Sequence, residues 1–122
     1  MKTVLVVDDS RIMRNIVKNT FAALNIQCEY LEAENGKKAF HLLETSKVSI
    51  VFLDWNMPEM DGMAFLKKVR LMPNYKNLPI IMVTSEAAKY NVIEALHNGA
   101  TDYIVKPVRE KVFIDKVSDI RF

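Results

Sequence analysis

The sequence predicts a single α/β domain built on a parallel β-sheet, and three observations support this prediction. The chain has 122 residues, the length of one ordinary domain, with no visible repeat or linker. Four short apolar runs rich in β-branched residues are nearly continuous, which is typical of strands buried on both faces of a parallel sheet. Segments with helical spacing of apolar residues follow the runs. The order strand then helix, five times over, favours a parallel sheet with right-handed crossovers.

The expected strands are short and end at polar residues. The first run, "VLVV", is followed by two aspartates, and the second, "IVFL", is followed by one. A weaker candidate, "CEYLEA", lies between them and completes the alternation of strands and helices. In chain order, the expected strands cover residues 4–7, 28–33, 50–53, 80–83 and 103–105.

The expected helices are marked by apolar periodicity and by residues suited to their ends. Ser10 can cap the first helix and Asp61 the third, because short polar side chains accept hydrogen bonds from the first free amides of a helix. Gly99 is expected to end the fourth helix, since glycine readily adopts the left-handed conformation found at helix ends. The expected helices cover residues 10–25, 37–44, 62–72, 86–99 and 109–120.

The composition excludes several classes of protein. There are 17 basic and 15 acidic residues, a balance too mild to indicate binding to nucleic acid or to an anionic membrane. Cys28 is the single cysteine, so no intramolecular disulfide can form. No apolar run approaches the roughly 18 residues that a membrane helix needs. The N-terminus also lacks the apolar core of a signal peptide, so we expect a cytoplasmic protein without membrane insertion.

The residues that follow the strands carry the chemistry. Ligands of open α/β sheets bind outside the carboxyl ends of the strands. Asp8 and Asp9 follow the first strand, Asp54 the third, Thr84 the fourth and Lys106 the fifth. All five are therefore expected to project toward one edge of the sheet.

This set of side chains indicates phosphoryl chemistry at a divalent cation. Crowded carboxylates repel one another unless a cation shares the site, and Mg²⁺ is usually held by one or two carboxylates together with phosphate oxygens. Lys106 and Thr84 suit phosphoryl oxygens, and Asp54 is placed to act as the nucleophile. Taken singly, Asp8, Asp9 and Thr84 could be helix caps and Lys106 a solvated surface charge. Their joint position favours a site.

Four motifs carry a resemblance to a known family. "VLVVDDS", "LDWNMPEMDG", "IIMVTSE" and "DYIVKP" resemble, in order and spacing, the receiver domain of bacterial two-component response regulators. The resemblance covers almost the whole chain, and the loop "DWNMP" is most similar to single-domain chemotaxis regulators of the CheY type. It implies a flavodoxin-like, three-layer (βα)5 sandwich whose sheet has the strand order 2-1-3-4-5.

The resemblance also implies how phosphorylation would occur. Asp54 would accept a phosphoryl group from a sensor histidine kinase, a phosphotransfer domain or a small donor such as acetyl phosphate. Asp9 and Asp54 would ligate Mg²⁺ directly, with Mn²⁺ as a possible substitute, and Asp8 would act through water or as a further ligand. The backbone carbonyl of Asn56 would complete the set of ligands. The protein would be a phosphoacceptor that gains and loses the group by its own activity, rather than an enzyme.

Further positions are implied to transmit and time the signal. Thr84 and Lys106 would bind the phosphoryl group, and Tyr103 would be the aromatic switch residue. Asn56 and Glu86 would tune the lifetime of the phosphorylated state, and the Lys106–Pro107 bond would be cis. A downstream protein would bind the face made by the fourth helix, last strand and last helix, with the chain a monomer or a phosphorylation-dependent dimer. The residues implied on that face are Ala87, Lys89, Tyr90, Val92, Tyr103 and Phe113.

Other readings are weaker. A receiver domain trimmed from a longer regulator would have the same motifs. An aspartate-nucleophile phosphatase of the haloacid dehalogenase type would need a general acid two residues after Asp54, where Asn56 cannot protonate a leaving group. A flavodoxin would need a phosphate-binding loop after the first strand, where Asp8 and Asp9 would repel phosphate. Two histidines, His41 and His97, lie on expected helices away from the strand ends.

Overall fold

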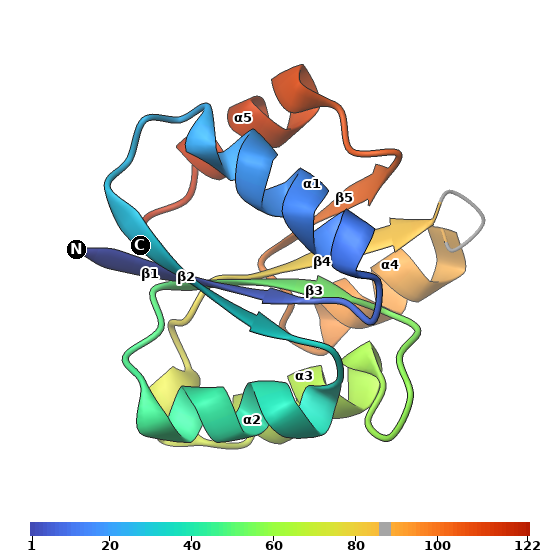
Figure 1. Ribbon diagram of the computed structural model, residues 1–122. Coiled ribbons are helices and arrows are strands. Elements are labelled where there is room, and N and C mark those ends of the chain that lie inside the picture. The colour runs from blue at the N-terminus through green and yellow to red at the C-terminus, as the bar shows by residue number, and fades with distance from the viewer. Residues whose placement is uncertain (86–88) are drawn as a thin grey trace.

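Five parallel strands form one sheet with helices on both faces (Figure 1). The computed structural model describes residues 1–85 and 89–122, and the side chains of residues 89 and 90 also lie outside the description. The sheet order is β2-β1-β3-β4-β5, so the predicted flavodoxin-like order 2-1-3-4-5 is confirmed. The strands are β1 (Lys2–Val7), β2 (Cys28–Ala33), β3 (Ile50–Asp54), β4 (Ile80–Ser85) and β5 (Asp102–Lys106).

Helices cover the sheet in two outer layers. In Figure 1, α1 and α5 lie on one side of the sheet, and α2 and α3 lie on the other. Among the described residues, no helix is long and apolar enough to cross a membrane. The helices are α1 (Arg11–Ala22), α2 (Gly36–Thr45), α3 (Gly62–Arg70), α4 (Lys89–His97) and α5 (Glu110–Ser118), with a short 3-10 turn, η1 (Pro73–Tyr75).

The helix starts follow from side-chain caps. Ser10 accepts a hydrogen bond from the Met13 amide at 3.3 Å, and Asp61 accepts one from the Ala64 amide at 2.8 Å, as the sequence predicted. Asn35, which the sequence analysis did not single out, caps α2 in the same way. Each cap satisfies an amide that has no partner within its helix.

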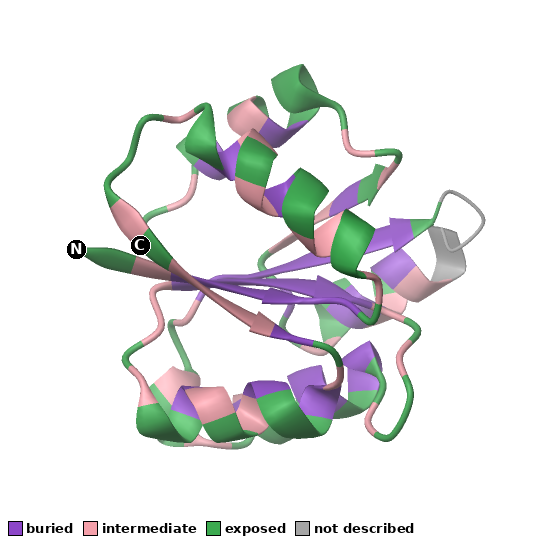
Figure 2. Ribbon diagram, in the orientation of Figure 1, coloured by how far each residue is buried: buried purple, intermediate pink, exposed green. Residues whose placement is uncertain are grey.

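The core has two halves, one on each face of the sheet (Figure 2). Because strand side chains alternate between faces, Val4 and Val6 of β1 pack toward α1 and α5, whereas Leu5 and Val7 pack toward the helices of the other face. Phe52 stacks on Phe113 with ring centroids 5.1 Å apart. The central strands are buried on both faces, as their nearly continuous apolar runs predicted.

Several element boundaries differ from the prediction by one to three residues. Asp54, Thr84 and Lys106 belong to their strands instead of following them, because the ladder continues to the pairs Asp54↔Val83, Thr84↔Val105 and Ser85↔Lys106. The first helix ends at Ala22, and Asn25, three residues beyond that end, has φ +57°. The start of the predicted fourth helix, residues 86–88, lies outside the described residues.

Candidate functional site

The carboxyl edge of the sheet brings the predicted acids and lysine together. Strand alternation places Asp54 on the same face as Phe52, and Lys106 on the same face as Ile104, which is the face covered by α1 and α5. Asp8 continues β1 on that face and is buried with only 3% of its surface exposed. Asp9, the next residue, is exposed. We call Asp8, Asp9, Asp54 and Lys106 the acidic site.

Lys106 joins two of the acids. Its Nζ donates a hydrogen bond to Asp54 Oδ1 at 3.0 Å and another to Asp8 Oδ2 at 3.2 Å. The second oxygen of Asp8 accepts a hydrogen bond from the Ser10 amide at 2.9 Å. Both oxygens of Asp8 therefore already have a protein donor, which leaves Asp8 less free to contact a ligand directly.

Asp54 is held by one oxygen only. Its Oδ1 accepts hydrogen bonds from Lys106 and from the Trp55 amide, the latter at 2.9 Å. Among the described residues, no protein group donates a hydrogen bond to Oδ2. Because its side chain is only 10% exposed, Asp54 presents a single oriented carboxylate with one oxygen available for chemistry.

Burial and neighbouring charges shift the pKa values of Asp54 and Lys106. Burial raises the pKa of Asp54, and the Asp8 carboxylate raises it further, while Lys106 only partly offsets these effects. For Lys106, burial alone would lower the pKa, but its hydrogen bonds and charge interactions with Asp54 and Asp8 raise it above its usual range. The lysine stays protonated at neutral pH, whereas the site still has an excess of negative charge.

The acids are spaced to hold a cation. One carboxylate oxygen from each of Asp8, Asp9 and Asp54 lies within 4.8 Å of the others. Three carboxylates face one lysine, so a divalent cation would relieve the repulsion that Lys106 leaves. Oxygen donors of this kind suit hard cations. The residues present therefore fit a divalent metal.

The loop after β3 depends on a glycine. The Gly62 amide donates a hydrogen bond to the Trp55 carbonyl at 2.8 Å, which closes the loop of residues 55–61 against the end of β3. A Cβ at position 62 would collide with the backbone carbonyl of Asp54. Only glycine therefore lets α3 start this close to the predicted phosphoacceptor. Within the loop, Glu59 has φ +66°.

Thr84 and Tyr103 lie on the opposite side of the sheet from Asp54 and Lys106. Thr84 is 2% exposed, and its place one residue beyond Val83 puts it next to the strand position that pairs with Asp54. Tyr103 packs against the core on that same face. The Nζ of Lys116 lies 3.8 Å from the centre of the Tyr103 ring and also contacts Asp102 at 3.2 Å. The sequence did not predict the Asp102–Lys116 ion pair, because it joins two different elements, β5 and α5.

The residues predicted on the partner surface can be compared with their burial at only some positions. Phe113 is fully buried and Val92 is 8% exposed, so neither side chain is available to a partner, and the prediction is wrong for these two positions. Each faces the core because it lies on the apolar stripe of its helix. Glu86 and Ala87 lie outside the described residues, as do the side chains of Lys89 and Tyr90.

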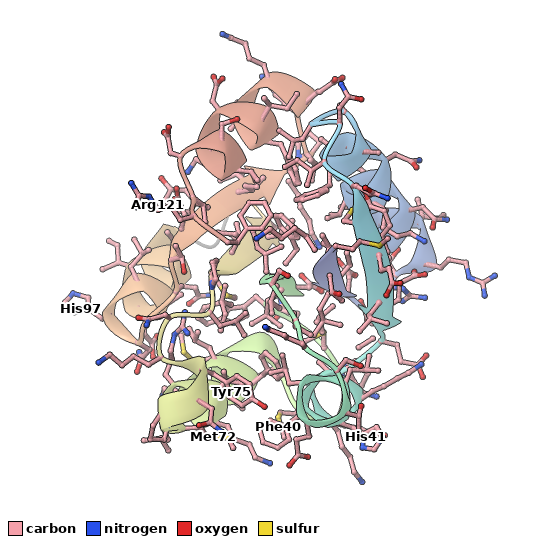
Figure 3. The ribbon with its side chains drawn as sticks, turned by 90° about the vertical axis from the view of Figure 1, so that its left-hand side faces the viewer. Phe40, His41, Met72, Tyr75, His97 and Arg121 are labelled. Atoms are coloured by element: carbon pink, nitrogen blue, oxygen red, sulfur yellow. The ribbon has the colours of Figure 1, made fainter. Side chains whose placement is uncertain are left out.

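The two histidines take no part in the site. His41 and His97 are both exposed. In Figure 3, which views the molecule from the side opposite the carboxyl ends of the strands, they lie at opposite margins of the fold. The prediction that the Lys106–Pro107 bond is cis is confirmed.

The raised pKa of Asp54 predicts that this residue destabilises the metal-free protein. With a folded pKa above its unfolded value of about 3.9, Asp54 binds more protons in the folded state, so stability falls as the pH rises through this interval. In EDTA at pH 7, we expect Asp54→Asn to raise the melting temperature, by about 3–5 °C for each kcal/mol regained. The gain should shrink as the pH approaches 4. Asp115→Asn, at an exposed acid on α5, is the control and should change little. An equal shift for both variants would contradict the assignment.

Comparisons with known proteins agree with the fold and identify the family. The chain matches the family described as response regulator receiver domain over residues 4–118. It is 48% identical over 117 residues to a chemotaxis protein CheY homolog of Campylobacter jejuni, which covers 95% of this chain and 89% of the relative. It is 46% identical over 114 residues to chemotaxis protein CheY1 of Helicobacter pylori, covering 93% and 91% of the two chains.

Solved structures give the same result. The crystallised chemotaxis protein CheY4 of Vibrio cholerae is 31% identical, with a TM-score of 0.87 and 99% of both chains covered. The sheet order and the family match together define this chain as a signal-receiving domain of two-component systems. The chain belongs to the response regulator receiver domain family, and the two curated relatives named above are chemotaxis proteins of the CheY type. An aspartate-nucleophile phosphatase is therefore not favoured.

Proposed function

We propose that this chain receives a phosphoryl group on Asp54 in a reaction that requires Mg²⁺. The observation that carries the proposal is the single orientation of the Asp54 carboxylate. Its Oδ1 is occupied by Lys106 and the Trp55 amide, while Oδ2 accepts no hydrogen bond from the described residues. The donor would be a sensor histidine kinase, a phosphotransfer domain or a small acyl phosphate.

The chemistry is a displacement at phosphorus. Asp54 Oδ2 forms a bond to phosphorus while the bond from phosphorus to the donor nitrogen or oxygen breaks, and the electron pair leaves with the donor. No proton has to be removed from Asp54, because the carboxylate is already the nucleophile. Lys106 keeps Oδ1 in place and brings positive charge close to the transferred oxygens, so positioning and charge neutralisation do most of the catalysis.

The metal would be Mg²⁺, with Mn²⁺ as a possible substitute. When bound, the cation would neutralise charge on the phosphoryl oxygens. Asp9 and Asp54 would hold it directly, together with the backbone carbonyl of Asn56. Asp8 would contribute through water, which agrees with the two protein donors that its carboxylate already has.

Signalling would follow from a change in conformational populations. Thr84 would move to bind the phosphoryl group, and Tyr103, on the same side of the sheet, would then change position. The altered face would comprise α4, β5 and α5, with Tyr103, Lys89 and Tyr90 as candidate contacts for a downstream protein. The polar residues Asn56 and Glu86 would favour a short-lived phosphorylated state.

The cellular role would be that of a regulator rather than an enzyme. A histidine kinase upstream and a protein target downstream are general features of the class, and chemotaxis or motor control is the role that the named relatives suggest. We place the protein in the cytoplasm, without nucleic-acid binding or membrane insertion. It would act as a monomer or as a dimer formed on phosphorylation.

Incubation with acetyl phosphate and Mg²⁺ tests the proposal. Intact mass spectrometry should show the gain of one phosphoryl group in the wild-type protein and none after chelation by EDTA. Asp54→Ala should abolish the gain, while Asp115→Ala, at an exposed acid paired with Lys111, should retain it. Modification that persists in Asp54→Ala would place the acceptor elsewhere and refute the assignment.

A further inference from the structure

A chain of contacts connects β2 and α1 to the acidic site. On α1, Arg14 donates a hydrogen bond from Nη1 to the backbone carbonyl of Asp8 at 2.7 Å and another from Nε to Glu32 Oε1 on β2 at 3.0 Å. Lys18, one turn further along α1, binds the other oxygen of Glu32 at 2.9 Å. The Arg14 side chain is only 13% exposed.

These contacts hold Arg14 in one orientation. The hydrogen bond from Lys18 lowers the pKa of Glu32, and Arg14 lowers it further against the effect of burial, so Glu32 stays ionised at neutral pH. A guanidinium presents its donors in a planar fork, and a fork held at Nε by a carboxylate has little freedom at Nη1. Glu32 therefore fixes the direction in which Arg14 donates to Asp8.

The carbonyl of Asp8 belongs to the same peptide group as the amide of Asp9. Asp8 is otherwise held by its own amide, which bonds Ala33, and by its side chain. Among the described residues, no hydrogen bond to the Asp9 side chain is present, and Asp9 is exposed. The Asp8–Asp9 peptide plane therefore orients the backbone from which the Asp9 carboxylate projects, and among the described residues Arg14 is the side chain that bonds its carbonyl.

We infer that Arg14, oriented by Glu32, is a positioning residue for the metal-binding carboxylate of Asp9. The inference rests on the proposed function, because it concerns the same cation. The positioning role and the charge of Arg14 predict opposite changes in Mg²⁺ affinity when Arg14 is removed. Removal of a positive side chain near a cation site should tighten metal binding a few-fold by electrostatics. Loss of positioning should weaken it about 10-fold, a usual effect of outer contacts on metal ligands.

The test compares Mg²⁺ dissociation constants measured by calorimetry for the wild-type protein, Arg14→Met and Lys18→Met. Lys18→Met is the matched control, because it removes the same charge from the same helix and the same glutamate without touching Asp8. We expect about 10-fold weaker binding in Arg14→Met and no weakening in Lys18→Met. Equal weakening in both variants, or binding by Arg14→Met as tight as in the wild type, would overturn the inference.

A second measurement needs no metal. The backbone order parameter of the Asp9 amide, from ¹⁵N relaxation in EDTA, should fall from about 0.85 toward 0.6 in Arg14→Met and stay high in Lys18→Met. Arg14→Lys keeps the charge but cannot hold Glu32 and the Asp8 carbonyl together, so it should show the same loss if Arg14→Met does not fold. An unchanged order parameter in the folded variant refutes the positioning role. A different result would refute the proposed metal chemistry alone. In that case the wild-type protein would bind no Mg²⁺, but the order parameter of the Asp9 amide would still fall in Arg14→Met.

Discussion

Replacing Lys106 with methionine should slow phosphorylation of Asp54 by acetyl phosphate about 100-fold, the usual effect of losing one donor that stabilises a developing charge. Lys106 binds Asp54 at 3.0 Å and Asp8 at 3.2 Å, so its loss removes both the orientation of the nucleophile and the positive charge beside it. Methionine keeps the length and apolar character of the stem. The rate should be followed by intact mass at saturating Mg²⁺.

The same substitution should strengthen Mg²⁺ binding. Without Lys106, two buried carboxylates lose their cationic partner, and a divalent metal becomes their main source of charge neutralisation. Slower phosphorylation combined with tighter metal binding would separate a direct role of Lys106 in phosphoryl transfer from a role in assembling the metal site. A variant that lost both properties together would show that Lys106 only maintains the local structure.

Lys116→Met is the matched control for Lys106→Met. Lys116 also pairs with an aspartate at 3.2 Å, but that residue is Asp102, whose carboxylate lies outside the acidic site. Partly exposed ion pairs contribute little to stability, so loss of Lys116 should leave the fold and the acidic site intact. The phosphorylation rate of Lys116→Met should therefore stay within about twofold of the wild-type rate. A rate as slow as that of Lys106→Met would contradict the special role of Lys106.

Most of the site could be predicted because it depends on periodicity. Apolar runs of strand length identify the strands, and the carboxyl ends of parallel strands share one edge, so Asp8, Asp54 and Lys106 had to meet there. The two hydrogen bonds from Lys106 were harder to predict, since the one to Asp8 spans 98 residues and the one to Asp54 spans 52. It depends on the register between strands, which local patterns do not contain.

The contacts that were missed join side chains of different elements. Arg14 and Lys18 lie four residues apart on one helix face, a signal that they could share a partner, but nothing near them in sequence identifies Glu32 as that partner. Asp102 and Lys116 are separated in the same way by the turn between β5 and α5. Such pairs become visible only when the packing of helices on the sheet is known.

The error at Phe113 has a different cause. The resemblance placed this position on the output face, whereas its spacing with Val117 already put both residues on the apolar stripe of their helix. Both are buried in the structure. Where a residue role carried over from a family conflicts with helical phase, the phase is the better guide to exposure, because it reflects the packing of this chain itself.

Stability should depend strongly on Arg70, at the opposite end of the sheet from the acidic site. Its guanidinium donates three hydrogen bonds to backbone carbonyls: Gly99 at 2.8 Å, Tyr75 at 2.6 Å and Leu78 at 2.7 Å. These bonds connect α3 to the segments before β4 and β5. We expect Arg70→Met to lower the free energy of unfolding by about 3–4 kcal/mol, because charge-assisted bonds are lost and partly buried carbonyls remain without donors.

Urea unfolding at pH 7 measures this loss, and two variants separate its causes. Lys67→Met removes an exposed charge from the same last turn of α3, so it accounts for the interaction of charge with the helix end, about 0.3–1 kcal/mol. Arg70→Lys keeps that charge but cannot reach three carbonyls at once, and it should recover less than half of the loss. If Arg70→Met were no less stable than Lys67→Met, the three carbonyls would be satisfied by water, and the guanidinium would not connect these segments. Phosphorylation of Asp54 in the folded Arg70→Met protein should be unchanged, because the two sites lie at opposite ends of the strands.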